Sequence, residues 1–281
     1  MDSETVVLLD GLVFPEGPRW HEGKLWFSDM HAHRVMTVDL DGKVETIVEV
    51  PQQPSGLGWL PDGRLLVVSM SDRRLLRLDP DGLTEAANLG DLVSYPLNDM
   101  VVDQQGRAYI GNFGFDLHNQ EPFAPAEIIL VTPDGRARIV ADNLAFPNGS
   151  VITPDMDTFI VGESRGRCLT AYDIEPDGSL SHRRIWAQLE GALPDGISLD
   201  AEGAIWVASP ISSEVLRVHE GGEVSQRIKI TTQAFACMLG GQDRRTLFIL
   251  TAESSNREKA KESVSGRIEI VEVEVPGAGL P

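Results

Sequence analysis

The chain has 281 residues, 42% of them hydrophobic, and a formal net charge of −19 at pH 7. A chain of this length can bury one large core or two small ones. The negative charge counts against nucleic acid and anionic membranes as partners, because binding phosphate groups needs clustered lysine and arginine. It fits solubility and affinity for cations equally well.

Cysteine content and apolar patterning bear on the compartment. Cys168 and Cys237 cannot form the disulfide framework of a small secreted domain, and we expect both to be small buried residues. The opening MDSETVVLLDG lacks a signal-peptide pattern, and no apolar run approaches the ~18 residues that a membrane-spanning helix needs. We therefore expect a cytoplasmic protein, a monomer or a weak homo-oligomer, without nucleic-acid or membrane partners.

Six units of one pattern follow one another along the chain. Each unit begins with a turn and a short apolar stretch, passes through a hairpin turn such as PDG, and continues in a stretch rich in β-forming residues. The residues directly after the six opening turns are Glu16, Ser55, Asn98, Asn148, Asp195 and Ala236.

The spacing of these units predicts the fold. The turn residue precedes its counterpart in the second stretch by eleven positions in five units, as from Ser55 to Leu66, and by ten in the first, from Glu16 to Trp26. Third and fourth stretches follow, joined by D-G or G-G turns that are typical of hairpins. Four short strands per unit, repeated every 39 to 50 residues, predict one all-β domain over residues 1–281, a six-bladed β-propeller.

The two ends of the chain predict how the ring closes. ETVVLLDG near the N-terminus has no partner in its own unit, and the last unit ends with GRIEIVEVEV. We expect the N-terminal strand to complete the C-terminal blade. The alternative, a pair of β-sandwiches, does not explain six units in one register.

The first strand of each propeller blade lines the central channel, so the six turn residues should converge. Two carboxylates, two carboxamides and a hydroxyl are hard oxygen ligands of the kind that Ca²⁺ prefers. Glu16 and Asp195 would repel each other without a cation, and one of them would take up a proton. Asn and Asp also favour turns before strands, but that preference does not explain a set in common register.

Four motifs, FPEGPRW, LND, FPNG and LPDG, resemble those of the senescence marker protein, gluconolactonase and luciferin-regenerating-enzyme family of regucalcin-like six-bladed propellers. The resemblance extends over nearly the whole chain. It implies that Glu16, Asn148 and Asp195 bind a divalent metal ion, and that Asn98 lies beside it and contacts substrate, or the metal through water.

Three or four side-chain ligands leave positions open on Ca²⁺, which is typical of a catalytic site. We expect metal-dependent hydrolysis of a lactone, in which the metal polarises the carbonyl group and Asp195 takes a proton from the attacking water while Glu16 holds the metal. No G-x-S-x-G motif is present, so Ser55 is expected to line the channel. Ca²⁺ is favoured, and Zn²⁺, Mg²⁺ and Mn²⁺ stay open, because all accept such ligands.

Connections between second and third strands should lie on the same face and set the substrate. Two of them are long, residues 112–126 and 253–266, and long loops on a rigid scaffold often carry specificity. The H-x-H pair of the first unit is found at zinc sites, but matching cysteine or carboxylate spacing is absent. Besides Asn98 and Ser55, the expected substrate-binding residues are His31, His33, Phe113, Phe115 and His118. The phenylalanines, with Phe123, could equally pin the first loop.

Pro96 stands where regucalcin-like members carry an arginine two residues before the Asn of ND. The proline side chain offers no hydrogen-bond donor, so gluconolactone is less secure as the substrate than the propeller is as the fold. Together with the Phe-rich loop, this leaves room for a more apolar lactone or ester. A non-catalytic propeller that binds a divalent cation or a small molecule would keep the same ligands, and turnover alone separates it from an enzyme.

Overall fold

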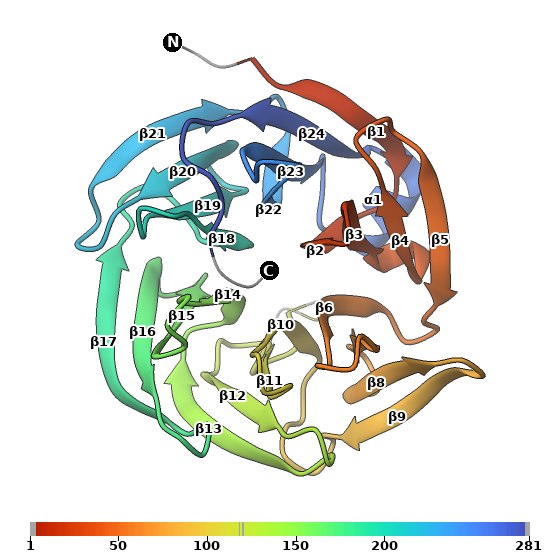
Figure 1. The fold of residues 1–281 in the computed structure, drawn as a ribbon, viewed down its shortest axis with the longest axis vertical. Coiled ribbons are helices and arrows are strands. Elements are labelled where there is room, and N and C mark those ends of the chain that lie inside the picture. The colour runs from red at the N-terminus through yellow and green to blue at the C-terminus, as the bar shows by residue number, and fades with distance from the viewer. Residues whose placement is uncertain (1–3, 118, 120, 279–281) are drawn as a thin grey trace.

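The computed structural model describes residues 4–117, 119 and 121–278. Within them the strands form six antiparallel sheets of four strands each, arranged around a central axis as a propeller (Figure 1). The predicted fold class is confirmed. The first strands β2, β6, β10, β14, β18 and β22 surround the axis, and the last strand of each blade lies at the periphery (Figure 1).

The strands of the first three blades follow chain order. Blade 1 consists of β2 (Pro15–His21), β3 (Lys24–Asp29), β4 (Arg34–Val38) and β5 (Val44–Glu49). Blade 2 consists of β6 (Pro54–Trp59), β7 (Leu65–Ser69), β8 (Arg74–Asp79) and β9 (Gly82–Asn88). Blade 3 consists of β10 (Leu97–Val102), β11 (Ala108–Asn112), β12 (Ala126–Val131) and β13 (Ala137–Leu144).

The remaining blades repeat this order until the ring closes. Blade 4 consists of β14 (Pro147–Ile152), β15 (Thr158–Glu163), β16 (Cys168–Ile174) and β17 (Leu180–Gln188). Blade 5 consists of β18 (Ile197–Leu199), β19 (Ile205–Ser209), β20 (Glu214–Val218) and β21 (Val224–Lys229). Blade 6 consists of β22 (Gln233–Gly240), β23 (Thr246–Ala252), β24 (Gly266–Glu272) and β1 (Val6–Leu12).

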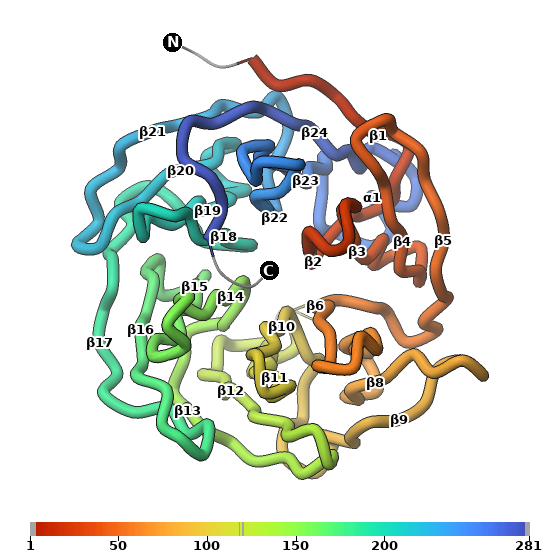
Figure 2. Tube along the Cα trace, in the orientation of Figure 1, coloured from red at the N-terminus to blue at the C-terminus, as the bar shows by residue number. Residues whose placement is uncertain are grey.

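The N-terminal strand closes the ring as predicted. β1 pairs antiparallel with β24, from Val6 opposite Ile270 to Leu12 opposite Gly266. Figure 2 shows the N-terminal red segment running along the outside of the blue β24. Both ends of the chain therefore stabilise one blade.

Burial explains why inner and outer strands read differently in the sequence. The inner strand β7 is buried along its whole length, because neighbouring blades cover both of its faces. The outer strand β5 is exposed at four of its six positions. The core lies between blades, as where Val35 and Val50 pack with Leu57, Leu65 and Val67. Continuous apolar runs thus mark the inner strands.

Helix is confined to two short segments of the described residues, η1 (Met30–Ala32) and α1 (Arg257–Ser263). α1 lies in the long connection 253–266. Asn256 caps it, since its side chain accepts a hydrogen bond from the Lys259 backbone N–H at 3.2 Å. Neither segment is long and apolar enough to cross a membrane.

The chain beyond β24 crosses toward the middle of the ring (Figure 1). There the Ala201 N–H donates to the Pro276 carbonyl oxygen at 2.8 Å, and Gly277 forms a β-bridge with Asp200. Asp200 directly follows β18, so this segment lies at the end of the channel where the first strands finish. The other end, where they begin, is the one at which the predicted ligands should meet.

Candidate functional site

A cavity of about 520 Å³ lies at the end of the channel where the first strands begin. Every blade contributes to it in the same way. Residues near the start of a first strand include Glu16, Gln53, Asn98, Asn148, Asp195 and Phe235. Residues just after a second strand include His31, Ser71, Phe113, Arg165, Ile211 and Asn256. The connections after the second strands thus reach the same cavity as the turn residues, as expected.

Glycines allow the strand starts to converge on the axis. In four blades the turn residue is followed by a glycine that packs against the first strand of the next blade: Gly17, Gly56, Gly149 and Gly196. A Cβ atom on Gly56 would lie 2.4 Å from the Met100 nitrogen, and one on Gly149 would lie 2.6 Å from the Ile197 nitrogen. Any side chain would push the blades apart and carry the neighbouring turn residue away from the axis.

Glu16 and Asp195 lie deep in the molecule, and part of each side chain is exposed to the cavity. Burial raises the pKa of Glu16 well above its usual range, and the nearby Asp195 charge raises it further. Burial raises the pKa of Asp195 to about 8, with a further increase from the Asp99 charge. Two buried carboxyl groups whose charges repel each other are stabilised either by a proton on one of them or by a cation.

Hydrogen bonds orient the two carboxamides beside these carboxyl groups. The Asn148 Nδ2 donates to Ser164 Oγ at 3.3 Å, and that hydroxyl donates to the Pro194 carbonyl oxygen at 2.7 Å. Asn148 also hydrogen-bonds the Asp195 carboxyl group, which moderates its raised pKa. The Asn98 Nδ2 donates to the Pro147 carbonyl oxygen at 3.0 Å. With both amide nitrogens engaged as donors, the Oδ1 atoms are the groups left to accept.

The structure therefore brings the four predicted polar residues to one cavity: Glu16, Asn98, Asn148 and Asp195. Two carboxylates and a carboxamide oxygen form a donor set that could hold a hard divalent cation. Within the described ranges no three residues among His, Cys, Asp and Glu cluster in a way that could hold a metal. The donor set reaches three only through the Asn148 amide.

The predicted histidines are placed differently. His31 lines the cavity, with its ring stacked on Phe14 at 4.9 Å between centroids, its Nδ1 at 3.0 Å from Gln53 Nε2 and its Nε2 at 3.1 Å from the Ser255 carbonyl oxygen. His33 does not line the cavity, and its Nε2 lies 2.9 Å from the Arg257 guanidinium. The ring nitrogens of His31 and His33 hydrogen-bond to different residues, so the two side chains are not arranged to bind one zinc ion together.

The remaining predicted substrate-binding residues divide in the same way. Phe113 lines the cavity, whereas Phe115 is buried behind it and Phe123 is 52% exposed. Ser55 is buried and does not line the cavity, and its carbonyl oxygen accepts a hydrogen bond from Ser28 Oγ at 2.7 Å. His118 lies outside the described residues.

Two charged residues of the site region escaped the sequence interpretation. Asp99, the D of the LND motif, pairs with buried Arg19 at 2.8 Å, and its charge raises the pKa of both Glu16 and Asp195. Arg165 lines the cavity from a short turn after β15. Connections between second and third strands were expected to lie on the face of the cavity. Applied to the short connections as well as the long ones, this expectation would have identified Arg165.

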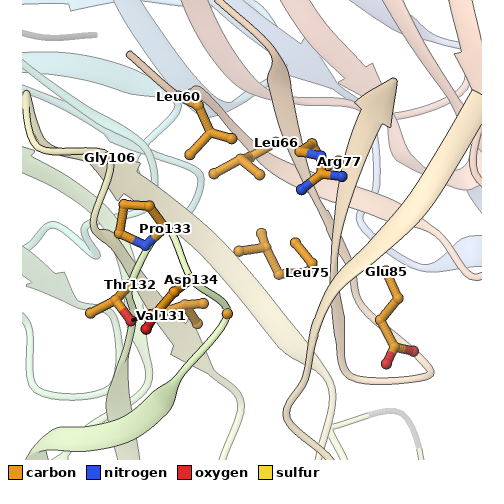
Figure 3. A pocket seen from close by; sticks show the side chains of 12 residues that line it. Leu60, Leu66, Leu75, Arg77, Glu85, Gly106, Val131, Thr132, Pro133 and Asp134 are labelled. Carbon is orange, nitrogen blue, oxygen red and sulfur yellow. Dashed lines mark hydrogen bonds between the residues drawn. The ribbon is translucent and has the colours of Figure 1, made fainter. Parts of the chain in front are cut away.

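A second cavity, of about 120 Å³, lies between blades 2 and 3 (Figure 3). Leu60, Leu66 and Leu75 line it from blade 2, and none of the predicted site residues reaches it. Its arginine, Arg77, is already paired with Asp79 at 2.7 Å. The cavity at the channel end is therefore the better candidate.

Comparisons with known proteins show which proteins this chain resembles. Residues 14–253 match the family described as the SMP-30/Gluconolactonase/LRE-like region. A 6-deoxy-6-sulfogluconolactonase of Pseudomonas putida is 29% identical, over 96% of this chain and 94% of its own, and a pentonolactonase of Haloferax volcanii is 28% identical, over 84% and 81%. The crystal structure of a calcium-binding protein, regucalcin, from Agrobacterium tumefaciens superposes with a TM-score of 0.83 at 23% identity, covering 99% of this chain and 97% of that one.

Proposed function

Because the chain belongs to the SMP-30/gluconolactonase/LRE-like family, we propose that it is a hydrolase that opens a lactone with one divalent metal ion bound. The observation that carries this proposal is the meeting of Glu16, Asn148 and Asp195 at one cavity large enough for a small molecule. The lactonase names of two relatives support the reaction class.

Glu16, Asn148 and Asp195 would hold the metal, because their oxygens supply two negative charges and a neutral acceptor at one place. A bound divalent ion would polarise the lactone carbonyl group and stabilise the negative charge that develops on its oxygen. All-oxygen donors favour Ca²⁺, and Mg²⁺, Mn²⁺ and Zn²⁺ remain to be compared with it.

The side chains divide the other tasks. Asp195 accepts the proton of the attacking water on a carboxylate oxygen, and Asn148 fixes the orientation of that carboxylate by its hydrogen bond. Asn98, held by the Pro147 carbonyl oxygen, positions the substrate. His31 and Phe113 form part of the wall that surrounds the substrate.

The test measures proton release with a panel of lactones, from gluconolactone to alkyl-substituted γ-lactones, on protein stripped with a chelator and reloaded with each metal. We expect metal-dependent turnover that an Asp195→Ala variant loses. Asp81→Ala, a change in an exposed turn, is the matched control and should retain the wild-type rate. Tight metal binding without turnover of any lactone would refute the proposal.

That outcome would favour a non-catalytic propeller that binds a cation or small molecule. The regucalcin structure, which is described as a calcium-binding protein, is the observation behind this second candidate. Turnover of open-chain esters alone would instead indicate a non-lactone esterase.

A further inference from the structure

Arg165 is the only arginine or lysine among the described residues that line the cavity. Its guanidinium lies over the ring of Phe115, 5.8 Å from the ring centroid, and it forms no ion pair with a carboxylate of the described residues. Its side chain is exposed at the cavity rim. The donor groups of this cation are therefore free to bind a ligand.

The backbone holds Arg165 in a fixed place. Its N–H donates to the Ala145 carbonyl oxygen at 2.9 Å, and the preceding Ser164 N–H donates to the Phe146 carbonyl oxygen at 3.0 Å. The Ser164 hydroxyl also accepts the hydrogen bond of Asn148. Arg165 and the proposed metal ligand Asn148 therefore lie on the same wall of the cavity.

The wall beside Arg165 is aromatic. Phe113 and Phe146 line the cavity with their ring centroids 4.8 Å apart, and Phe115 packs against Phe146 at 5.9 Å while it supports the guanidinium. Ile211, which is 55% exposed, adds another apolar surface from blade 5. These carbon surfaces suit an apolar part of a ligand and offer no partners to a row of hydroxyl groups.

We propose that the substrate is a lactone with a short apolar arm that ends in an anionic group, and that Arg165 binds this anion. This inference rests on the proposed lactonase function. A guanidinium binds a carboxylate or a sulfonate through charge-assisted hydrogen bonds. In a protein with a net charge of −19, an anionic ligand requires such a local positive charge to offset the repulsion of the whole molecule.

The test compares γ-butyrolactones that carry a 2-carboxyethyl arm, the isosteric neutral carboxamide arm, or a 2-sulfonatoethyl arm. Wild-type protein should prefer the charged arms. Arg165→Gln should lower kcat/KM for these by about 10-fold to 100-fold, mainly through KM, and change the carboxamide lactone less than about 3-fold. The sulfonate and carboxylate arms together show which anion fits.

Arg167→Gln is the matched control, because Arg167 is an exposed arginine two residues away that does not line the cavity. It should leave all three rates unchanged. Equal losses on charged and neutral lactones in Arg165→Gln, or no preference in the wild-type protein, would overturn the inference.

Calorimetry with the carboxyethyl-tetrahydrofuran analogue, which cannot be hydrolysed, separates this inference from the proposed function. Weaker binding to Arg165→Gln than to wild-type protein would support anion recognition even if no lactone were turned over. Equal binding to both proteins would contradict it, whatever the lactones do.

Discussion

The two ends of the propeller channel differ in whether their buried carboxylates are paired with arginine. Where the first strands finish, Asp200 accepts hydrogen bonds from two backbone N–H groups and pairs with Arg217 at 2.7 Å. Asp103 has the same arrangement with Arg107 at 2.5 Å. Where the strands begin, Glu16 and Asp195 line one cavity, and no arginine or lysine among the described residues forms an ion pair with either of them.

The difference distinguishes buried carboxylates that the fold compensates from those that it does not. A buried carboxylate costs folding free energy unless hydrogen bonds and an opposite charge compensate it. Asp200 and Asp103 receive that compensation within the fold. Arg19, a buried arginine whose charge acts on Glu16, is already bound to Asp99. Glu16 and Asp195 receive no such ion-pair compensation from the described residues, which is the reason for proposing them as metal ligands.

The largest effect should come from replacing the charge at the cavity end without changing its shape. Asp195→Asn removes the proposed base and a metal ligand, so we expect the rate of lactone hydrolysis to fall by about 100-fold or more. The same change relieves repulsion with Glu16, so the metal-free protein should be as stable as the wild type or more stable in denaturant unfolding. A marked loss of stability would mean that Asp195 is structural, like Asp200.

The complementary change at the other end should reverse this pattern. Arg217→Met leaves the buried Asp200 carboxylate without its cation and should reduce the free energy of unfolding by about 3–5 kcal/mol. Activity per folded molecule should persist, since Arg217 does not line the cavity. Urea unfolding and the lactone assay on the same sample measure stability and activity. An inactive but stable variant would contradict the assignment of Arg217 and Asp200 to stability alone.

Metal binding should act on the cavity end alone. A divalent ion at 100 times its Kd should stabilise the folded protein by about 2.7 kcal/mol, and Glu16→Gln should abolish most of this gain. Protons compete for the same oxygens, because the pKa of Glu16 is raised and that of Asp195 is raised to about 8. Apparent metal affinity should therefore increase as pH rises toward and through 8. Calorimetric titrations at several pH values test this, and affinity independent of pH would contradict it.

Repetition made the ring predictable from the sequence. Six turns in common register identified the strand starts, and four of the six turn residues, Glu16, Asn98, Asn148 and Asp195, line one cavity. The same register did not distinguish Ser55, whose turn is packed too closely against the neighbouring blades to face the cavity. Position along the repeat thus gives the direction of a residue, while packing decides whether its side chain is accessible.

Contacts between segments far apart in the sequence could not be predicted, because the repeat register does not show which side chains pack together. The pairing of Arg19 with Asp99 joins blades 1 and 3, and the position of Arg165 over Phe115 joins blade 4 to the connection in blade 3. Neither pair shares a motif or a fixed spacing. The charge balance of the site depends on these contacts, so the sequence predicts which residues meet at the cavity better than it predicts their electrostatics.

The smallest effect concerns β2, which carries Glu16 at its start and His21 at its end. The His21 ring stacks on Trp59 with centroids 3.9 Å apart, and partial burial lowers its pKa. A lowered pKa in the folded state means that neutral His21 contributes stability above its unfolded pKa of about 6.5, and that this contribution is lost as pH falls through and below that value. The melting temperature of the wild type should therefore decrease slightly more between pH 7 and pH 5 than that of His21→Gln. Identical pH profiles would show that His21 does not contribute to the pH dependence of stability. Any pH dependence that arises from β2 would then come from Glu16, at the cavity end of the strand.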